Sequence, residues 1–108
     1  MSRRVVVTGL GAVTPLGLTV DESWRRALAG ESGISKITRF ATEGFDVQIA
    51  GEVKGFNSDQ WVAKKEQKKM DLFIHFSLAA TKMALDQAGL VISESMAPKT
   101  GVIMGVGM

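Results

Sequence analysis

The sequence has 108 residues, of which 45% are hydrophobic and 22% are charged, a balance typical of a folded globular domain and not of a disordered chain. It contains no cysteine and one histidine, His75, which excludes a disulfide scaffold, a thiolate metal site, a cysteine nucleophile and any pair of imidazoles. The net charge of +2 is too small to indicate nucleic-acid binding through bulk charge. No apolar run reaches about 18 residues, so the sequence predicts no membrane span.

The amino terminus begins with arginines and an apolar stretch, as a secretory signal peptide does. Glycines, threonines and Pro15 interrupt this stretch, however, and no cleavage site of small residues ends it. Successive apolar and β-branched residues from 5 to 10 are instead typical of a strand that is covered on both faces, as in a parallel sheet. We therefore expect a buried strand followed by a loop over residues 11–17, and no signal peptide.

A first helix is predicted after Thr19. This residue and Glu22 have the spacing of a capping box, in which the hydroxyl accepts from an amide of the first turn and the carboxylate accepts from the cap amide. Val20 and Trp24 lie on an apolar face of the helix, and Gly30 ends it.

Between this helix and the lysine-rich segment the patterns are short. Residues 31–46 have no sustained period and are predicted as mostly loop. Residues 47–53 alternate between apolar and polar or small side chains, which predicts a strand with one wet face. Asn57 or Ser58 then caps a short helical piece.

The longest predicted element is a helix from about residue 66 to residue 88. Four polar side chains fall in one narrow stripe of it: Asp71, His75, Lys82 and Asp86. Nearly all the rest of its surface is apolar or small, so the helix is expected to be buried from several sides. It needs more partner surface than the other predicted elements supply.

A last apolar strand is predicted over residues 100–106. Two buried strands separated by helices indicate an α/β protein with parallel strands. Because the chain stops just after an apolar strand that bears glycines, we expect it to be the first quarter or so of a larger protein.

Gly9 and Gly11 follow the first strand, as the glycines of a dinucleotide-binding loop do. That loop needs a third small residue and a helix that begins directly after it. This sequence has Thr14 and then Pro15 there, and the helix cap comes only at Thr19. We therefore interpret the glycines as allowing a tight exit from a buried strand.

His75 lies four residues after Asp71, a spacing that suits a solvated pair on a helix. A general base or a metal ligand is the alternative, but no second ligand has a suitable spacing. We interpret His75 as part of a surface pair and predict no metal site in this chain.

Four lysines crowd into residues 64–69, at the predicted start of the long helix. Their charges are unfavourable there, because the helix macrodipole is positive at that end and because lysines four residues apart repel each other. A solvated face and a docking patch for an acidic partner are both open interpretations.

Several stretches in a fixed order carry a family resemblance: RVVVTGLG at 4–11, PLG at 15–17, LAGESGI at 28–34, KEQKKMD at 65–71, AGL at 88–90 and GVG at 105–107. Together they resemble the amino-terminal part of a 3-oxoacyl-[acyl-carrier-protein] synthase, in the type II, elongating branch of the condensing enzymes. The KEQKKMD stretch favours type II over type I.

The resemblance implies a thiolase-like α/β fold of alternating helix and sheet layers, with residues 1–108 as an incomplete part of the amino-terminal domain. It implies decarboxylative Claisen condensation of malonyl-acyl carrier protein with an acyl thioester, by a cytoplasmic homodimer. The implied partner is acyl carrier protein, and neither nucleic acid nor a membrane is expected. No metal or dissociable cofactor is implied beyond the phosphopantetheine arm that carries the substrate.

The family's catalytic cysteine and two histidines have no counterpart in this chain, so we expect no catalytic residue here and no activity from the 108 residues alone. Lys65, Lys68 and Lys69 match basic residues that contact the acidic carrier protein in related synthases. Met108 falls where type II synthases place an apolar residue at the mouth of the acyl-chain pocket. An ordinary apolar residue at a strand end is the alternative for Met108.

Two alternatives to a condensing enzyme stay open. A chain-length or decarboxylating partner of a polyketide synthase would share the fold but lack the cysteine, and the residue that discriminates is not among these 108. A free-standing binding module is the other alternative. The apolar end of the chain and the long apolar helix argue against it.

Overall fold

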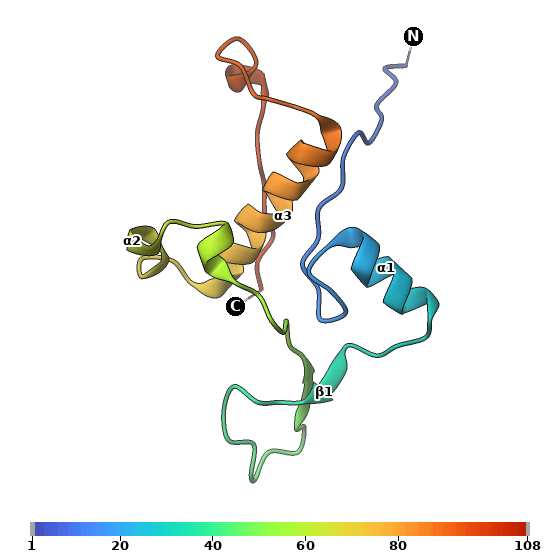
Figure 1. Ribbon diagram of the computed structural model, residues 1–108, viewed down its shortest axis with the longest axis vertical. Helices are drawn as coiled ribbons and strands as arrows, with labels where there is room; N and C mark the ends of the chain where they lie inside the picture. Colours follow the sequence, from blue (N-terminus) through green and yellow to red (C-terminus); the bar gives the residue numbers. More distant parts are fainter. Residues whose placement is uncertain (1, 108) are drawn as a thin grey trace.

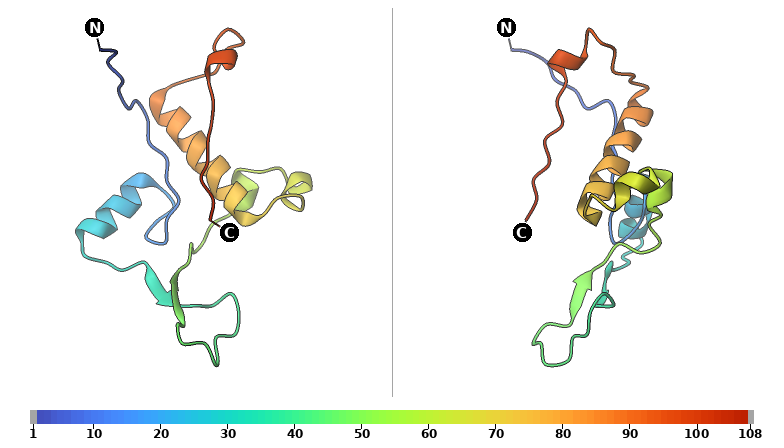
Figure 2. Two further views of the ribbon diagram at one scale, coloured as in Figure 1. Left: turned by 180° about the vertical axis from the view of Figure 1, so that it is seen from behind. Right: turned by 90° about the vertical axis from the view of Figure 1, so that its left-hand side faces the viewer.

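Figure 1 shows the computed structural model of the chain, which describes residues 2–107. Helices and two short strands follow one another along it: α1 (Val20–Leu28), β1 (Ile34–Lys36), β2 (Ile49–Gly51), the 3₁₀ helix η1 (Ser58–Gln60), α2 (Lys64–Gln67), α3 (Leu72–Ala88) and the 3₁₀ helix η2 (Ala97–Lys99). Helices α1 and α2 lie on opposite sides of α3, and the β1–β2 hairpin projects beyond all three (Figures 1 and 2).

Helix α1 begins and ends as predicted. Thr19 is the N-cap residue, and its hydroxyl accepts from the Glu22 amide at 3.2 Å. The Glu22 carboxylate reaches one residue further back than expected and accepts from the Leu18 amide at 2.9 Å. Gly30 follows the helix with a φ of 73°, a left-handed conformation that suits a helix end.

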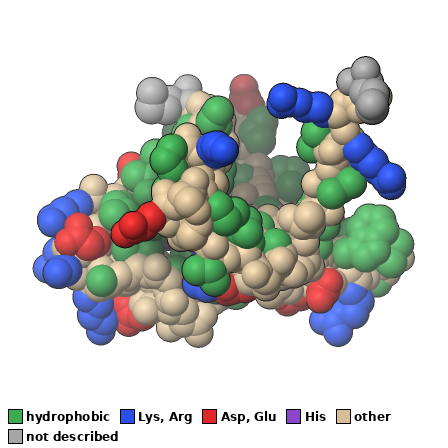
Figure 3. Space-filling view, turned by 90° about the horizontal axis from the view of Figure 1, so that it is seen from above, with side chains coloured by type: hydrophobic (Ala, Val, Ile, Leu, Met, Phe, Trp, Pro, Cys, Tyr) green, Lys and Arg blue, Asp and Glu red, His purple; other side chains and the backbone are tan. Residues whose placement is uncertain are grey.

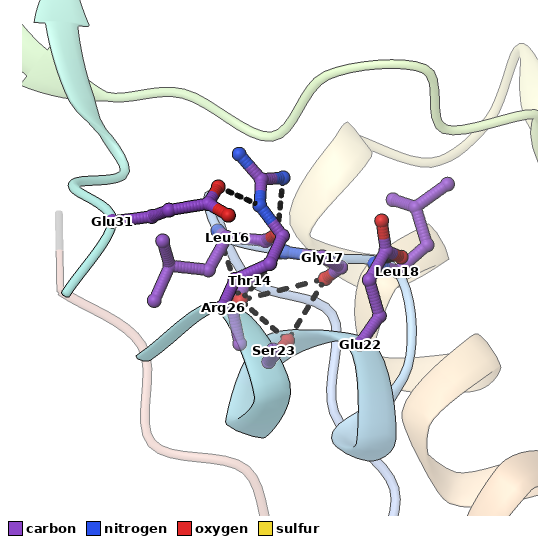
Figure 4. A network of polar contacts seen from close by, with 8 residues as sticks. All are labelled: Thr14, Leu16, Gly17, Leu18, Glu22, Ser23, Arg26 and Glu31. Atoms are coloured by element: carbon purple, nitrogen blue, oxygen red, sulfur yellow. Dashed lines mark hydrogen bonds and ion pairs between the residues drawn. The ribbon is translucent and has the colours of Figure 1, made fainter. Parts of the chain in front are cut away.

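Polar side chains close the loop that precedes α1 (Figure 4). The Thr14 hydroxyl lies 2.8 Å from the hydroxyl of Ser23 on α1. Arg26 donates to the Leu16 carbonyl and to the Glu31 carboxylate, each at 2.5 Å. These bonds satisfy backbone groups of a loop that would otherwise depend on water, and they hold the loop against α1.

The predicted strand at 47–53 is present as the shorter β2, and its partner β1 lies in a segment predicted as loop. The strands pair antiparallel, with Ile34 opposite Gly51 and Lys36 opposite Ile49. The prediction missed β1 because three residues are too few to establish an alternating pattern.

Glu52 holds the chain together just beyond this hairpin. Its buried carboxylate accepts from the Thr38 amide and hydroxyl and from the Arg39 amide, at 2.8–3.3 Å. The hydrogen bonds from Thr38 are the main reason that the pKa of Glu52 lies below its ordinary value. The Glu52 side chain therefore ties the residue after β2 to the segment that follows β1.

Helix α3 begins at Leu72, six residues later than predicted. The chain turns over residues 68–70, and Asp71 becomes the N-cap residue with an extended backbone. Aspartate favours such a position over a helix interior, and repulsion within the lysine run opposes a continuous helix. The helix ends at the predicted place, where Gly89 has a φ of 62°.

The amino-terminal segment lies directly against the backbone of α3. A Cβ added to Gly11 would stand 1.8 Å from the Ala80 carbonyl oxygen, and Gly9 lies as tightly against the following turn. The Leu10 amide donates to the Gln87 side chain at 2.6 Å. Neither glycine has a positive φ. They allow a close approach to the helix, and the prediction of a tight exit from a strand is corrected accordingly.

Neither predicted buried strand, at 5–10 and 100–106, is hydrogen-bonded as a strand within the described residues. Their side chains are largely exposed, with Val5 at 89% and Ile103 at 97%. A strand forms only where a neighbouring strand supplies its backbone hydrogen bonds, and residues 2–107 supply none to either segment. Both strand predictions are therefore wrong for this structure, in which the β1–β2 hairpin is the one sheet of the described residues.

The described residues bury little apolar surface. Val62 and Ala79 are the apolar side chains that are buried among residues 2–107. The radius of gyration is 17.0 Å, whereas a compact domain of this length would have about 13 Å. On α3, Phe73 and Leu78 remain 45% and 43% exposed. The covering that the sequence predicted for this helix is not supplied by the described residues.

Candidate functional site

The four lysines lie on α2 and in the turn that follows it. Lys64 and Lys65 begin α2, Lys68 is its C-cap residue, and the Lys69 amide donates to the Glu66 carbonyl at 3.0 Å. All four lysines are exposed. The prediction that they begin the long helix is wrong, because a turn separates them from α3. The macrodipole of α3 acts only near the first turn of that helix, so it does not destabilise the lysine charges as the sequence predicted.

Two acidic side chains lie among these lysines. The Asp59 Oδ2 atom is 3.4 Å from the Lys64 Nζ atom, and both carboxylate oxygens of Glu66 lie 3.2–3.3 Å from the Lys69 Nζ atom. Figure 3 shows basic and acidic side chains next to one another at the end of the molecule that carries α2. The charges of the cluster are therefore partly compensated within it.

Lys65 and Lys68 have no ion-pair partner among the described residues. Over residues 59–69, which we call the lysine cluster, four lysines and two carboxylates leave a net charge of +2. An exposed segment with this charge attracts an acidic partner over a distance of about a Debye length. Its two uncompensated cations are Lys65 and Lys68.

Asp59 also fixes α2 in place. The Gln67 side-chain amide donates to the Asp59 Oδ1 atom at 2.9 Å and to the Val62 carbonyl at 2.8 Å. The hydrogen bond from Gln67 is the main cause of a lowered pKa of Asp59, and the attraction of Lys64 acts in the same direction. The carboxylate is thus an ionised link between η1 and α2.

His75 connects this region to α3. Its Nδ1 atom lies 2.8 Å from the Ser58 hydroxyl, and its side chain is only 6% exposed. The Nε2 atom is buried and has no hydrogen-bond partner among the described residues. With no group there to orient the ring, the pair lacks the third member of a nucleophile-and-base arrangement. The predicted surface pair with Asp71 is wrong, because the imidazole is buried against η1.

Among residues 2–107, no three histidine, aspartate or glutamate side chains gather in a way that could hold a metal ion. None of the helices in that part of the chain is both long and apolar enough to cross a membrane. Met108, predicted at an acyl-chain pocket, lies outside the described residues.

Sequence reasoning found the lysines of the cluster but missed the side chains that organise it. The pair of Glu66 and Lys69 has the i,i+3 spacing of helical neighbours and could have been identified. The contacts of Asp59 with Lys64 and Gln67 cross a turn, and no sequence spacing indicates them.

The comparisons with known proteins cover most of the chain. Residues 2–108 match the family model described as "Beta-ketoacyl synthase, N-terminal domain". Over 106 residues, the chain is 48% identical to 3-oxoacyl-[acyl-carrier-protein] synthase 2 of Vibrio cholerae and 44% identical to the protein of that name from Synechocystis sp.. Each alignment covers 98% of this chain and 26% of the relative, so the chain spans about a quarter of their length.

A solved structure is similar as well. It is described as "The ishigamide ketosynthase/chain length factor" and superposes with a TM-score of 0.76 at 40% sequence identity. The similarity covers 84% of this chain and 23% of that one.

Proposed function

The chain belongs to the beta-ketoacyl synthase N-terminal domain family and has part of its thiolase-like α/β fold, and on this premise we propose that it works in a condensing acyltransferase of fatty acid elongation. The observation that carries the proposal is the 48% identity to a 3-oxoacyl-[acyl-carrier-protein] synthase 2 over 98% of the chain. The proposed reaction is the decarboxylative Claisen condensation of malonyl-acyl carrier protein with an acyl thioester.

In this reaction a cysteine thiolate first takes the acyl chain from its carrier protein and releases the carrier's thiol. Malonyl-acyl carrier protein then loses carbon dioxide, and the resulting carbanion attacks the acyl thioester carbon and expels the cysteine thiolate. Hydrogen-bond donors stabilise the oxyanions that develop. The chain has no cysteine, so the nucleophile must come from outside these residues, as must the two histidines of the family.

The part proposed for these residues is to bring the carrier protein to the enzyme. Lys65, Lys68 and Lys69 form an exposed basic surface on and after α2, and acyl carrier protein is an acidic partner. No cofactor is proposed beyond the phosphopantetheine arm, and a cytoplasmic homodimer is proposed for the whole enzyme. Met108 is proposed to contact the acyl chain, and a changed chain-length preference in Met108→Phe would test that role.

A second candidate function shares the fold. The similarity to a ketosynthase/chain length factor structure favours a chain-length or decarboxylating partner of a polyketide synthase as the alternative. The two functions differ in whether the protein forms a new carbon–carbon bond.

The experiment uses the polypeptide in which this chain occurs naturally, supplied with acyl- and malonyl-acyl carrier protein. Release of carbon dioxide together with a 3-oxoacyl product supports the condensing function. Carbon dioxide without that product identifies a decarboxylating partner. Neither product would contradict the condensing function and leave only a chain-length partner. The isolated 108 residues are expected to show no turnover, because they lack the nucleophile.

The chain itself can be tested in a chimera in which it replaces the corresponding residues of the Vibrio cholerae relative, which we call the Vibrio chimera. At 48% identity, the replacement is expected to preserve condensation. A folded chimera that accepts a small carrier-free thioester but not acyl carrier protein would contradict the docking role of these residues.

A further inference from the structure

The lysine cluster contains a carboxylate, Glu66, that competes with an acidic partner for Lys69. From the contacts of Glu66 we infer that its carboxylate attenuates carrier-protein binding by holding Lys69, so that Lys65 and Lys68 make the first contacts. The inference rests on the proposed docking function and adds to it a residue that weakens the interaction.

The local backbone places Glu66 beside Lys69. The hydrogen bond from the Lys69 amide to the Glu66 carbonyl at 3.0 Å closes the turn that ends α2. This turn brings the two side chains to the same side, where both Glu66 oxygens lie 3.2–3.3 Å from the Lys69 Nζ atom. The pair therefore forms without an ordering cost elsewhere in the chain, and it is present before any partner arrives.

The exposure of the two side chains allows a partner to compete. The Lys69 side chain is 69% exposed and the Glu66 side chain 36% exposed. An exposed pair of this kind contributes little to stability. An acidic carrier can therefore take Lys69 from Glu66, at a cost that lowers the affinity modestly instead of abolishing it.

Glu66 differs in this respect from the other carboxylate of the cluster. Asp59 accepts from Gln67 as well as pairing with Lys64, so a substitution there also disturbs the link between η1 and α2. Lys69 is the one side chain to which the Glu66 carboxylate is hydrogen-bonded within the described residues. A change of Glu66 to glutamine therefore alters the charge of the cluster without removing a structural contact of η1.

The test is a double-mutant cycle of Glu66→Gln and Lys69→Gln in the Vibrio chimera. Stopped-flow association with a fluorescently labelled acyl carrier protein gives the rates at low salt. We expect Glu66→Gln to raise the association rate about twofold. Lys69→Gln lowers the net charge by one in either background, but the rate should fall about twofold further when Glu66 is replaced, because only then is Lys69 free to contact the carrier. Such non-additivity is the signature of two residues that interact.

Two controls make the outcomes separable. Glu43→Gln removes an exposed negative charge from the loop between β1 and β2, so it reports the effect of net charge alone. Lys65→Gln with Lys68→Gln tests the docking surface itself, and turnover of a carrier-free thioester verifies that each variant is folded. Additive effects of Glu66 and Lys69, or an equal gain from Glu43→Gln, overturn the inference while leaving the docking function intact. An unchanged rate in the Lys65 and Lys68 variant overturns the docking function and the inference together.

Discussion

The close approach of the amino-terminal segment to α3 leads to a quantitative prediction for Gly11→Ala. The new Cβ would stand 1.8 Å from the Ala80 carbonyl oxygen, and Cβ atoms essentially never come within 3.0 Å of such a neighbour. The segment and the helix must therefore separate by about 1.2 Å, and the obstacle is helix backbone that cannot rotate away. Overpacking of this kind costs about 1–3 kcal/mol. Loss of the hydrogen bond from Leu10 to Gln87 adds about 1 kcal/mol.

We expect Gly11→Ala to lower the free energy of unfolding of the Vibrio chimera by about 2–4 kcal/mol, measured from the shift of its urea midpoint. Gly101→Ala is the matched control, because no atom lies within 4 Å of its added Cβ, and its effect should stay within about 0.5 kcal/mol. Gly30→Ala isolates backbone strain, since that glycine has a φ of 73° but open space around it. Equal effects of Gly11→Ala and Gly101→Ala would refute the packing argument, and so would rescue of Gly11→Ala by Ala80→Gly, because the clash is with a carbonyl oxygen.

Three further predictions follow from the other contacts. Reversing the charges of Lys65 and Lys69 together to glutamate should slow carrier-protein association in the Vibrio chimera, most strongly at low salt because added ions screen the attraction; an association rate that does not change would contradict the docking surface. Because Thr38 lowers the pKa of Glu52 below 4.5, the stability that this carboxylate contributes is present above pH 4.5 and is lost as the pH falls through the folded-state pKa. The protection factor of the Thr38 amide against hydrogen exchange should therefore fall as the pH drops through the folded-state pKa of Glu52, and Glu52→Gln should remove this pH dependence of the protection factor. The isolated chain should show a broad thermal transition or none, since it buries so little apolar surface; a sharp calorimetric peak would contradict this.

The elements that could be predicted from the sequence are those whose signals are local. Thr19, Glu22 and Gly30 define both ends of α1 through contacts within a few residues, and the structure has the helix where these signals place it. Gly89 ends α3 for the same reason. The break before α3 was not predicted because lysine, glutamate and glutamine are good helix formers. Their high propensity favoured a continuous helix over one that begins after Asp71 as its N-cap residue.

The contacts that could not be predicted join segments far apart along the chain. His75 has helical spacing from Asp71, yet it is buried because η1 folds back and brings the Ser58 hydroxyl to its ring. Gly11 belongs to a motif that suggests a turn, but in the structure it is needed because α3 packs directly against it. For the candidate site, the charge run was visible in the sequence. Its division into paired and unpaired lysines depends in part on Asp59, which pairs with Lys64 across a turn.

The order of the lysine cluster is coupled to the packing of α3. Helix α2 has only four residues, too few for a helix to be stable by itself. The hydrogen bond from its Gln67 to Asp59 holds it against η1. The 3₁₀ helix η1 is in turn joined to α3 by the hydrogen bond between Ser58 and His75. If α3 loses its packing, this series of contacts loses its support, although every lysine is still present. The arrangement of the lysines therefore depends on α3 as well as on the residues of the cluster.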